Sequence, residues 1–513
     1  MNLIRSLINI SIITFLSRTL SFVRDFIVAY IFGVSISTDA FFIAFKIPNL
    51  LKRICAEGAF LQIIIPLLVG YKQKGKHHTT KYFFSCVLGF MIVTLFFMTL
   101  IGICLSAVII FLTAPGFLKQ PKEFALAVEL LRITFPYVFF VSLSALTTAV
   151  LNIWGYFVIP VFSPILLNIS MILFVVFLNK FFSMPILSLG WSVIFGGILQ
   201  FLYQFLFLSK IDMFVMPKIN FKILNISSLI TKVGMGIIGV SANHISLFIN
   251  GILASLFISG SVSWMYYADR LVEFPVGILG ISLGTILLSL LTKSIAEKNM
   301  KKFSQLLDWG LRITIIIGIP STIVIFILSR PIITVLFQYG KFTRFDTLMT
   351  EQSLLGYSIG LIAFILIKVL SPGFYARQDT KTPMIISIIT IIVTQVLNTI
   401  LFFVSLGQLG LSLSISFSSW LNVILLYWYL YKNKIFVPQS GWLRLFVKVI
   451  IASYILSVSL FFILNIMPPW DTGSVIYKLF RLFLLFLFST IVYLIALFIL
   501  RFRWNQLNFK VSN

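Results

Sequence analysis

The stretch that decides the fold is residues 482–500, which read LFLLFLFSTIVYLIALFIL and contain no Asp, Glu, Lys or Arg. A helix of about 20 apolar residues spans a bilayer, because each residue adds about 1.5 Å and the hydrocarbon core is about 30 Å thick. Similar stretches recur along the chain with only short polar breaks. Of the 513 residues, 60% are hydrophobic and 10% are charged, whereas soluble domains have roughly 25% charged residues. The composition therefore predicts an integral membrane protein.

These apolar runs are far longer than the alternating strands of about 10 residues that a membrane barrel needs. We therefore predict an all-α polytopic membrane protein with about 14 transmembrane helices, both termini on one side, and no separate soluble domain. The expected spans are residues 7–33, 37–70, 82–113, 124–152, 157–179, 185–208, 224–258, 263–292, 309–338, 349–370, 382–404, 408–431, 441–466 and 474–500.

The net charge of +25 would suggest nucleic-acid binding in a soluble protein. In a membrane protein, Lys and Arg in short loops also fix the orientation, because they stay on the cytoplasmic side. With a cytoplasmic N-terminus, the inner segments hold 19 Lys and Arg residues and the outer segments hold 5. We therefore expect no nucleic-acid partner, and we place both termini in the cytoplasm.

A short internal similarity supports a two-lobed architecture. The sequence Ile27-Val28-Ala29 resembles Ile252-Leu253-Ala254, at an offset of 225 residues. Transporters built of two repeated six-helix halves have such similarities. We expect an N-terminal lobe at 1–222 (spans 1–6), a C-terminal lobe at 223–436 (spans 7–12), and spans 13–14 with a cytoplasmic tail at 437–513.

Ten charged residues in or beside the expected spans are the candidate substrate-binding residues. A charge at the centre of a membrane helix costs about 2.5–3.5 kcal/mol, so it faces a watery cavity or a partner rather than lipid. The spacing favours a cavity, since Asp39, Lys46 and Arg53 are seven apart and share one helix face over roughly 20 Å. The ten are Arg18, Arg24, Asp39, Lys46, Lys52, Arg53, Glu57, Asp269, Arg270 and Glu273.

The basic members of this group predict an anionic ligand. The guanidinium of Arg18, Arg24 or Arg270 would match the oxygens of a phosphate or pyrophosphate, because its planar fork can donate two parallel hydrogen bonds. The alternative is that these charges are structural ion pairs, and for Asp39 and Glu57 this means holding basic residues in place. Neither interpretation requires a cofactor, a metal ion or a catalytic residue.

Several longer motifs resemble a known family. They are Arg24-Asp25, Thr38-Asp39-Ala40-Phe41-Phe42, Phe45 to Arg53 (FKIPNLLKR), Ala56-Glu57-Gly58-Ala59-Phe60, Trp264 to Pro275 (WMYYADRLVEFP), Phe337 to Phe342 (FQYGKF) and Pro372 to Arg377 (PGFYAR). In this order, from Met1 to about Arg503, the chain resembles the MurJ (MviN) family of lipid II flippases, within the multidrug/oligosaccharidyl-lipid/polysaccharide exporter superfamily.

The resemblance implies a function and a site. It implies a bacterial inner-membrane transporter that moves lipid II, the undecaprenyl-pyrophosphate-linked precursor of peptidoglycan in cell wall biogenesis, to the periplasmic leaflet by alternating access. It also implies a cationic cavity lined by spans 1, 2, 7 and 8 and a hydrophobic groove at spans 13 and 14. The family's cavity residues correspond to Arg18, Arg24, Asp39, Arg53 and Arg270, while Lys52 stands where the family has Arg. We expect lipid II and membrane lipids as the partners of a monomer.

Two alternatives remain from the sequence. An exporter of the same fold could carry another glycolipid or a drug, although a cavity for small cations would need acidic residues rather than this basic cluster. A membrane-embedded glycosyltransferase would need acidic catalytic residues at the membrane surface, and the expected outer loops are short with almost no Asp or Glu. We therefore predict a transporter rather than an enzyme.

Overall fold

The computed structural model describes residues 3–52, 68–72, 77–218, 249–403 and 406–502. These residues form helices joined by turns, and they include no β-strand. Within the same ranges, 11 helices are long and apolar enough to cross a membrane. The prediction of an all-α polytopic membrane protein is confirmed.

The 11 candidate helices correspond to expected spans 3–6 and 8–14. Expected span 1 is also helical, but it carries three intramembrane charges, Arg18, Arg24 and Asp25. Spans 2 and 7 are described only in part, because residues 53–67 and 219–248 lie outside the described ranges. The total of fourteen spans therefore stays a prediction.

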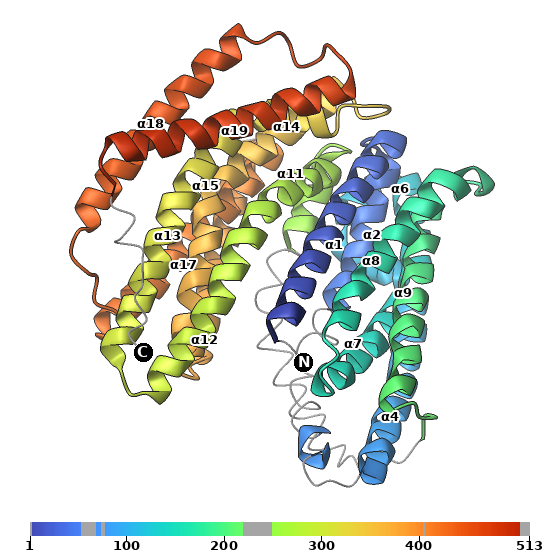
Figure 1. The fold of residues 1–513 in the computed structure, drawn as a ribbon. Coiled ribbons are helices and arrows are strands. Elements are labelled where there is room, and N and C mark those ends of the chain that lie inside the picture. Colours follow the sequence, from blue (N-terminus) through green and yellow to red (C-terminus); the bar gives the residue numbers. More distant parts are fainter. Residues whose placement is uncertain (1–2, 53–67, 73–76, 219–248, 404–405, 503–513) are drawn as a thin grey trace. The chain divides into compact units, whose positions relative to one another are not determined.

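The chain divides into two compact units, and unit 1 comprises Met1–Ser263 with Tyr339–Lys341. Within unit 1, α1 packs on α8, α2 on α6, and α7 on α9. The helices of this unit are α1 (Leu3–Phe32), α2 (Ile36–Leu51), α4 (His77–Cys104), α5 (Ser106–Thr113), α6 (Pro121–Thr134), α7 (Tyr137–Ile153), α8 (Val158–Leu173) and α9 (Leu187–Phe207), with short helices η2 (Pro115–Lys119), η3 (Phe174–Leu178), η4 (Asn179–Phe181) and η5 (Leu208–Ile211) (Figure 1).

Unit 2 comprises Trp264–Gln338 and Phe342–Asn513. Its first helix, α11, begins three residues earlier, in unit 1. The helices are α11 (Ser261–Pro275), η6 (Val276–Ile281), α12 (Ser282–Ala296), α13 (Met300–Ile327), α14 (Ser329–Leu336), α15 (Arg344–Tyr375), α16 (Lys381–Phe403), α17 (Gly407–Lys432), α18 (Trp442–Ile466) and α19 (Val475–Ile499) (Figure 1).

The long helix α15 is the centre of unit 2, since it packs on α12, α13, α14 and α17. Its contact with α17 depends on small residues. The Ser416 hydroxyl donates to the Gly356 carbonyl at 2.7 Å, and a side chain at Gly360 would collide with Ser416. Small residues let membrane helices approach closely, because dispersion contacts and interhelical hydrogen bonds hold such helices together.

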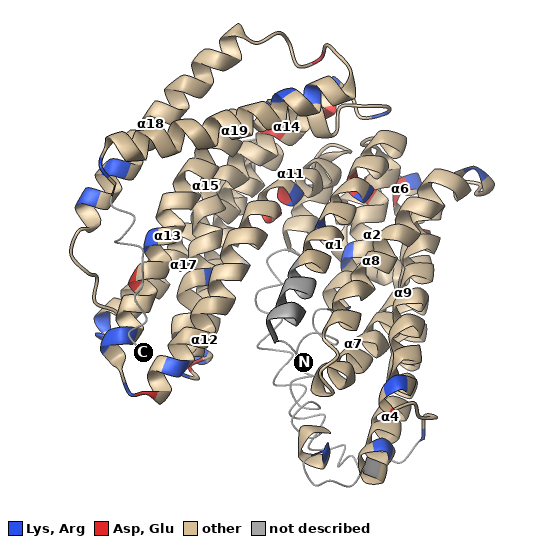
Figure 2. Ribbon diagram, viewed as in Figure 1, with Lys and Arg blue, Asp and Glu red and all other residues tan. Residues whose placement is uncertain are grey.

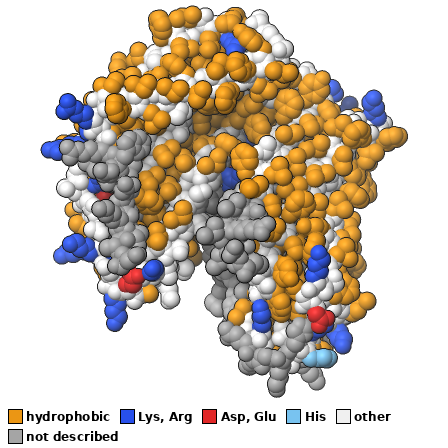
Figure 3. Space-filling model, viewed as in Figure 1, with side chains coloured by type: hydrophobic (Ala, Val, Ile, Leu, Met, Phe, Trp, Pro, Cys, Tyr) orange, Lys and Arg blue, Asp and Glu red, His pale blue; other side chains and the backbone are white. Residues whose placement is uncertain are grey.

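The surface of the helices suits a lipid environment. Large apolar side chains such as Leu443, Ile476 and Phe498 are almost fully exposed, at 78%, 80% and 79%. Charged residues lie mostly near helix ends, and hydrophobic side chains cover most of the visible face (Figures 2 and 3). Exposed apolar area on this scale would be unfavourable in water, so the chain is a multi-pass membrane protein.

Candidate functional site

Arg24 is held in a buried network in unit 1. Its side chain donates to Asp25 Oδ1 from Nη2 at 2.6 Å and from Nε at 2.9 Å. A third bond runs from Nη1 to Asn168 Oδ1 of α8 at 3.0 Å. Arg24 and Asp25 are only 5% and 3% exposed. Because three guanidinium nitrogens already have acceptors, this arginine joins α1 to α8, and its role as a substrate ligand stays a prediction.

Arg18 lies almost two turns earlier on α1 and has different surroundings. It is half-buried, and it makes no hydrogen bond or ion pair within the part of the chain that the structure describes. The backbone beside it is fixed, since the Asn168 side chain donates to the Ser17 carbonyl at 3.5 Å. A half-buried guanidinium on a fixed backbone is ready to accept an anion, because its five donors need acceptors.

The basic residues of α2 are only partly described. Lys46 and Lys52 are both half-buried. The Lys46 ammonium lies against Gly251 in the segment before α11, so closely that a Cβ at Gly251 would be 2.8 Å from Nζ. This brings α2 next to the end of expected span 7. Arg53 and Glu57 lie outside the described residues.

Asp39 stabilises the start of α11. Its carboxylate accepts from the Gly260 N–H at 2.6 Å, from the Ser263 N–H at 2.9 Å and from the Ser263 hydroxyl at 2.5 Å. The first N–H groups of a helix have no partner within the helix, and a negative charge there also complements the helix dipole. Gly260 has φ of +103°, a backbone conformation that favours glycine. Asp39, 1% exposed, therefore acts as a helix cap rather than as the partner of a described basic residue, and its role toward a substrate stays a prediction.

The remaining candidates lie together on α11 in unit 2. Arg270 donates from Nη1 to Glu273 Oε2 at 2.7 Å, and its guanidinium lies 5.5 Å from the ring centre of Tyr266. Asp269 and Glu273 are exposed, whereas Arg270 is half-buried. An ion pair that keeps this much exposure can exchange its carboxylate for a competing anion at low cost.

The helix that carries Arg270 changes its winding one turn later. Pro275 removes a backbone N–H, and residues Val276–Ile281 form the π-helix η6. π-Helical turns inside α-helices occur frequently at functional sites. The charged segment of α11 thus borders a locally irregular segment.

Two further groups of charges were not predicted from the sequence. Asp308 of α13 accepts from Arg312 Nε at 2.5 Å, from Trp442 Nε1 at 2.7 Å and from the Gln439 N–H at 3.1 Å. In the sequence, the only indication of this pair is that Asp308 and Arg312 are four residues apart, a spacing that places two side chains next to each other on a helix. The second is Lys368, a single lysine within the expected span 349–370.

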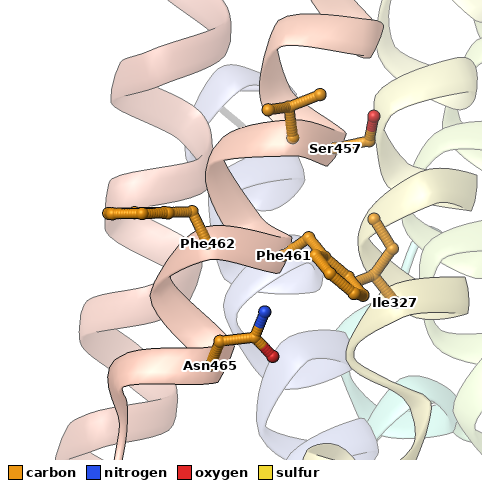
Figure 4. Close-up of a pocket in the computed structure, with 6 residues that line it drawn as sticks. Ile327, Ser457, Phe461, Phe462 and Asn465 are labelled. Carbon is orange, nitrogen blue, oxygen red and sulfur yellow. The ribbon is translucent and has the colours of Figure 1, made fainter.

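A groove lies beside the C-terminal half of α18, the helix that ends at Ile466. It has a volume of about 410 Å³ and is lined by Ile327 of α13 and by five residues of α18. In Figure 4, Phe461 lies beside Ile327 while Phe462 points away from it. The five residues of α18 are Ser457, Val458, Phe461, Phe462 and Asn465.

The chain is similar to known proteins over its whole length. The family model "Lipid II flippase MurJ" matches residues 28–481. A "Probable lipid II flippase MurJ" of Buchnera aphidicola subsp. Acyrthosiphon pisum is 47% identical over 513 residues, covering all of both chains. A "Lipid II flippase MurJ" of Burkholderia cenocepacia is 41% identical over 461 residues, covering 89% of each chain.

Solved structures agree with this assignment. The structure "Lipid II flippase MurJ, inward closed conformation" superposes with a TM-score of 0.79 at 28% identity, covering 95% of this chain and 98% of that one. An inward-facing multidrug resistance MATE family transporter superposes with a TM-score of 0.66, covering 82% of this chain and 94% of that one, but at 13% identity it shows the shared fold alone. On these matches and the basic residues in its membrane helices, the chain belongs to the MurJ family of lipid II flippases.

Proposed function

We propose that this protein flips lipid II from the cytoplasmic to the periplasmic leaflet of the bacterial inner membrane, by alternating access. The observation that carries the proposal is Arg18, a half-buried guanidinium in a membrane helix that makes no ion pair with any described residue. A charge in that position needs an anion to offset its desolvation. The pyrophosphate of lipid II supplies one.

The headgroup site would combine three groups of charged residues with different roles. Arg18, Lys46, Lys52 and Arg53 of the first two spans would contact the pyrophosphate directly, together with Arg270 of α11. Arg24 and Asp39 would act by holding α1 and α11 in position, since their polar atoms are occupied within the protein. Glu57, Asp269 and Glu273 would hold the basic side chains before the substrate binds.

The orientation and the division into lobes belong to the same proposal. Both termini would be cytoplasmic, because the inner segments then carry 19 of the 24 Lys and Arg residues in the loops and tails. Residues 1–222 and 223–436 would form the two lobes that alternate, and the protein would act as a monomer.

The polyprenyl tail would stay in contact with α18 and α19. The groove at Ile327 and Phe461 supports this, because it is lined mostly by apolar side chains (Figure 4). A tail held there remains in a hydrocarbon environment while the polar headgroup crosses. Deleting residues after Trp442 should therefore weaken lipid II transport and leave the preceding spans inserted.

The test is transport by the purified protein in liposomes, with lipid II, an unrelated glycolipid and a cationic drug as separate substrates. We expect translocation of lipid II and neither of the others. Transport of the drug or of the unrelated glycolipid, without transport of lipid II, would favour an exporter of the same fold and overturn the proposal.

A further inference from the structure

Asn168 of α8 forms hydrogen bonds to two different turns of α1. Its Oδ1 accepts from Arg24 Nη1 at 3.0 Å, and its Nδ2 donates to the Ser17 carbonyl at 3.5 Å. One turn further along α8, Met171 Sδ also accepts from Arg24 Nη1, at 3.8 Å. Because an arginine side chain only donates and a carbonyl only accepts, a residue that bonds to both needs an acceptor and a donor. The buried amide of Asn168 supplies both.

The geometry of α1 explains why one amide can reach both groups. Ser17 and Arg24 are seven residues apart, so they lie within about 20° of each other around the helix axis and about 10 Å apart along it. Backbone carbonyls point toward the C-terminus of a helix, whereas side chains lean toward the N-terminus. The Ser17 carbonyl and the Arg24 side chain therefore approach each other, and Asn168 bridges about two turns of α1.

The helix that carries Asn168 is itself attached closely to α9. The Ser170 hydroxyl of α8 donates to the Ser192 carbonyl of α9 at 2.8 Å, and both residues are buried. A Cβ at Gly196 of α9 would lie only 3.0 Å from the Cα of Leu167, so a side chain there would push the two helices apart. Helix α8 thus gives α1 a support that is packed on a third helix of the same unit.

Arg18 directly follows the carbonyl that Asn168 holds. It lies about 100° around the axis from Ser17, so its side chain starts from a different face of α1. This guanidinium is half-buried, and none of the described residues bonds to it. Its place therefore depends on the rotation and the height of α1. Asn168 fixes both, because two bonds seven residues apart resist turning and sliding of the helix.

We propose that Asn168 is a positioning residue for substrate binding, which places the Arg18 guanidinium for the anionic headgroup through its two bonds to α1. The inference rests on the proposed function, and it adds a residue of expected span 5 to a site predicted from spans 1, 2, 7 and 8. Asn168 itself does not contact the substrate, since both of its polar groups bond within the protein. A cation held in place binds an anion more tightly, because binding does not have to restrict its motion.

The experiment measures two quantities for the full-length protein: its affinity for undecaprenyl pyrophosphate in nanodiscs and its thermal unfolding midpoint. The main variant is Asn168→Leu, which has a similar shape and removes both bonds. Asn168→Asp keeps the acceptor for Arg24 and removes only the donor to Ser17, so it replaces the main variant if Asn168→Leu does not fold. Ser170→Ala is the matched control, because it removes a buried bond of α8 that leads to α9. Each Asn168 variant is also made together with Arg18→Ala.

We expect Asn168→Leu to weaken binding by about tenfold, because a displaced guanidinium loses a charge-assisted contact. Asn168→Asp should also bind more weakly, with a smaller change in the midpoint, since the contact with Arg24 remains. Ser170→Ala should lower the midpoint and leave the affinity at the native value. Together with Arg18→Ala, neither Asn168 variant should weaken binding further, because residues that act through one contact are not additive. The effect of Asn168→Leu on the midpoint should persist in the double variant.

Other results would overturn the inference in distinguishable ways. Native affinity of the Asn168 variants, with weaker binding by Arg18→Ala, would exclude Asn168 and leave the headgroup site intact. Additive losses in the double variants, or an equal loss of affinity for Ser170→Ala, would make Asn168 a structural residue of α8 without a role in placing Arg18. Native affinity of Arg18→Ala would contradict the headgroup site itself.

Discussion

The Tyr493 hydroxyl of α19 donates a hydrogen bond to the backbone carbonyl of Ile316 in α13, at 2.7 Å. The Ile316 carbonyl is available because the residue four positions later is Pro320, which has no N–H to donate. Tyr493 is buried, so water cannot replace the bond. A proline inside one membrane helix thus creates the attachment point for another.

We predict that Tyr493→Phe destabilises the protein by about 1 kcal/mol, because a buried carbonyl loses its donor. The thermal unfolding midpoint in detergent measures this. Tyr454→Phe is the control, since Tyr454 on α18 is 68% exposed and its loss should leave the midpoint unchanged. Equal midpoints for the two variants would show that the bond does not hold α19.

The ion pair of Asp308 and Arg312 should contribute more to the stability of the protein than the Tyr493 hydrogen bond does. Both residues are buried, and Asp308 also accepts from the Trp442 indole at the start of α18. Removing one partner of a buried pair costs about 3–5 kcal/mol, because the other charge is left without compensation. Asp308→Asn should therefore lower the unfolding midpoint strongly and make α18 accessible to proteases. Glu297→Gln breaks an exposed pair with Lys302 and should cost less than about 1 kcal/mol.

The role of Asp39 can be separated from substrate binding. Asp39→Ala leaves the donors of Gly260 and Ser263 without an acceptor, at about 1–3 kcal/mol for each buried group. We expect low levels of folded protein for Asp39→Ala, and a smaller loss for Ser263→Ala, which removes only the hydroxyl donor. Normal levels of Asp39→Ala with no lipid II transport would instead make Asp39 a substrate ligand.

The orientation predicts the position of two loops. A reporter fused at Lys301, in the first turn of α13, should be cytoplasmic, and one at Lys341, before α15, should be periplasmic. A periplasmic signal at Lys301 or a cytoplasmic signal at Lys341 would contradict the proposed orientation.

Much of the fold could be predicted from the sequence, because membrane spans are local features of composition. Residues 482–500 need no distant partner to become a helix, and α19 has nearly the expected bounds. The family could be recognised from the sequence for the same reason, since motifs such as that from Trp264 to Pro275 are continuous in the chain. The family model and the relatives confirm this resemblance.

The partners of the charged residues could not be predicted in the same way. Helix periodicity places Arg18 and Asp25 on one face, yet Asp25 pairs with its neighbour Arg24, and Asn168 from another helix completes the network. Similarly, the donors to Asp39 come from more than 220 residues away. Periodicity fixes the face of one helix, whereas these contacts depend on which helices are adjacent.

The most direct test of the headgroup site is lipid II translocation in liposomes by Arg18 variants. Because Arg18 has no protein partner among the described residues, Arg18→Ala should insert at normal levels and unfold at the native midpoint, but it should lose translocation by at least about tenfold. Arg18→Lys should retain part of the activity, since it keeps the charge and loses the planar fork. Translocation at the native rate by correctly inserted Arg18→Ala would contradict the account.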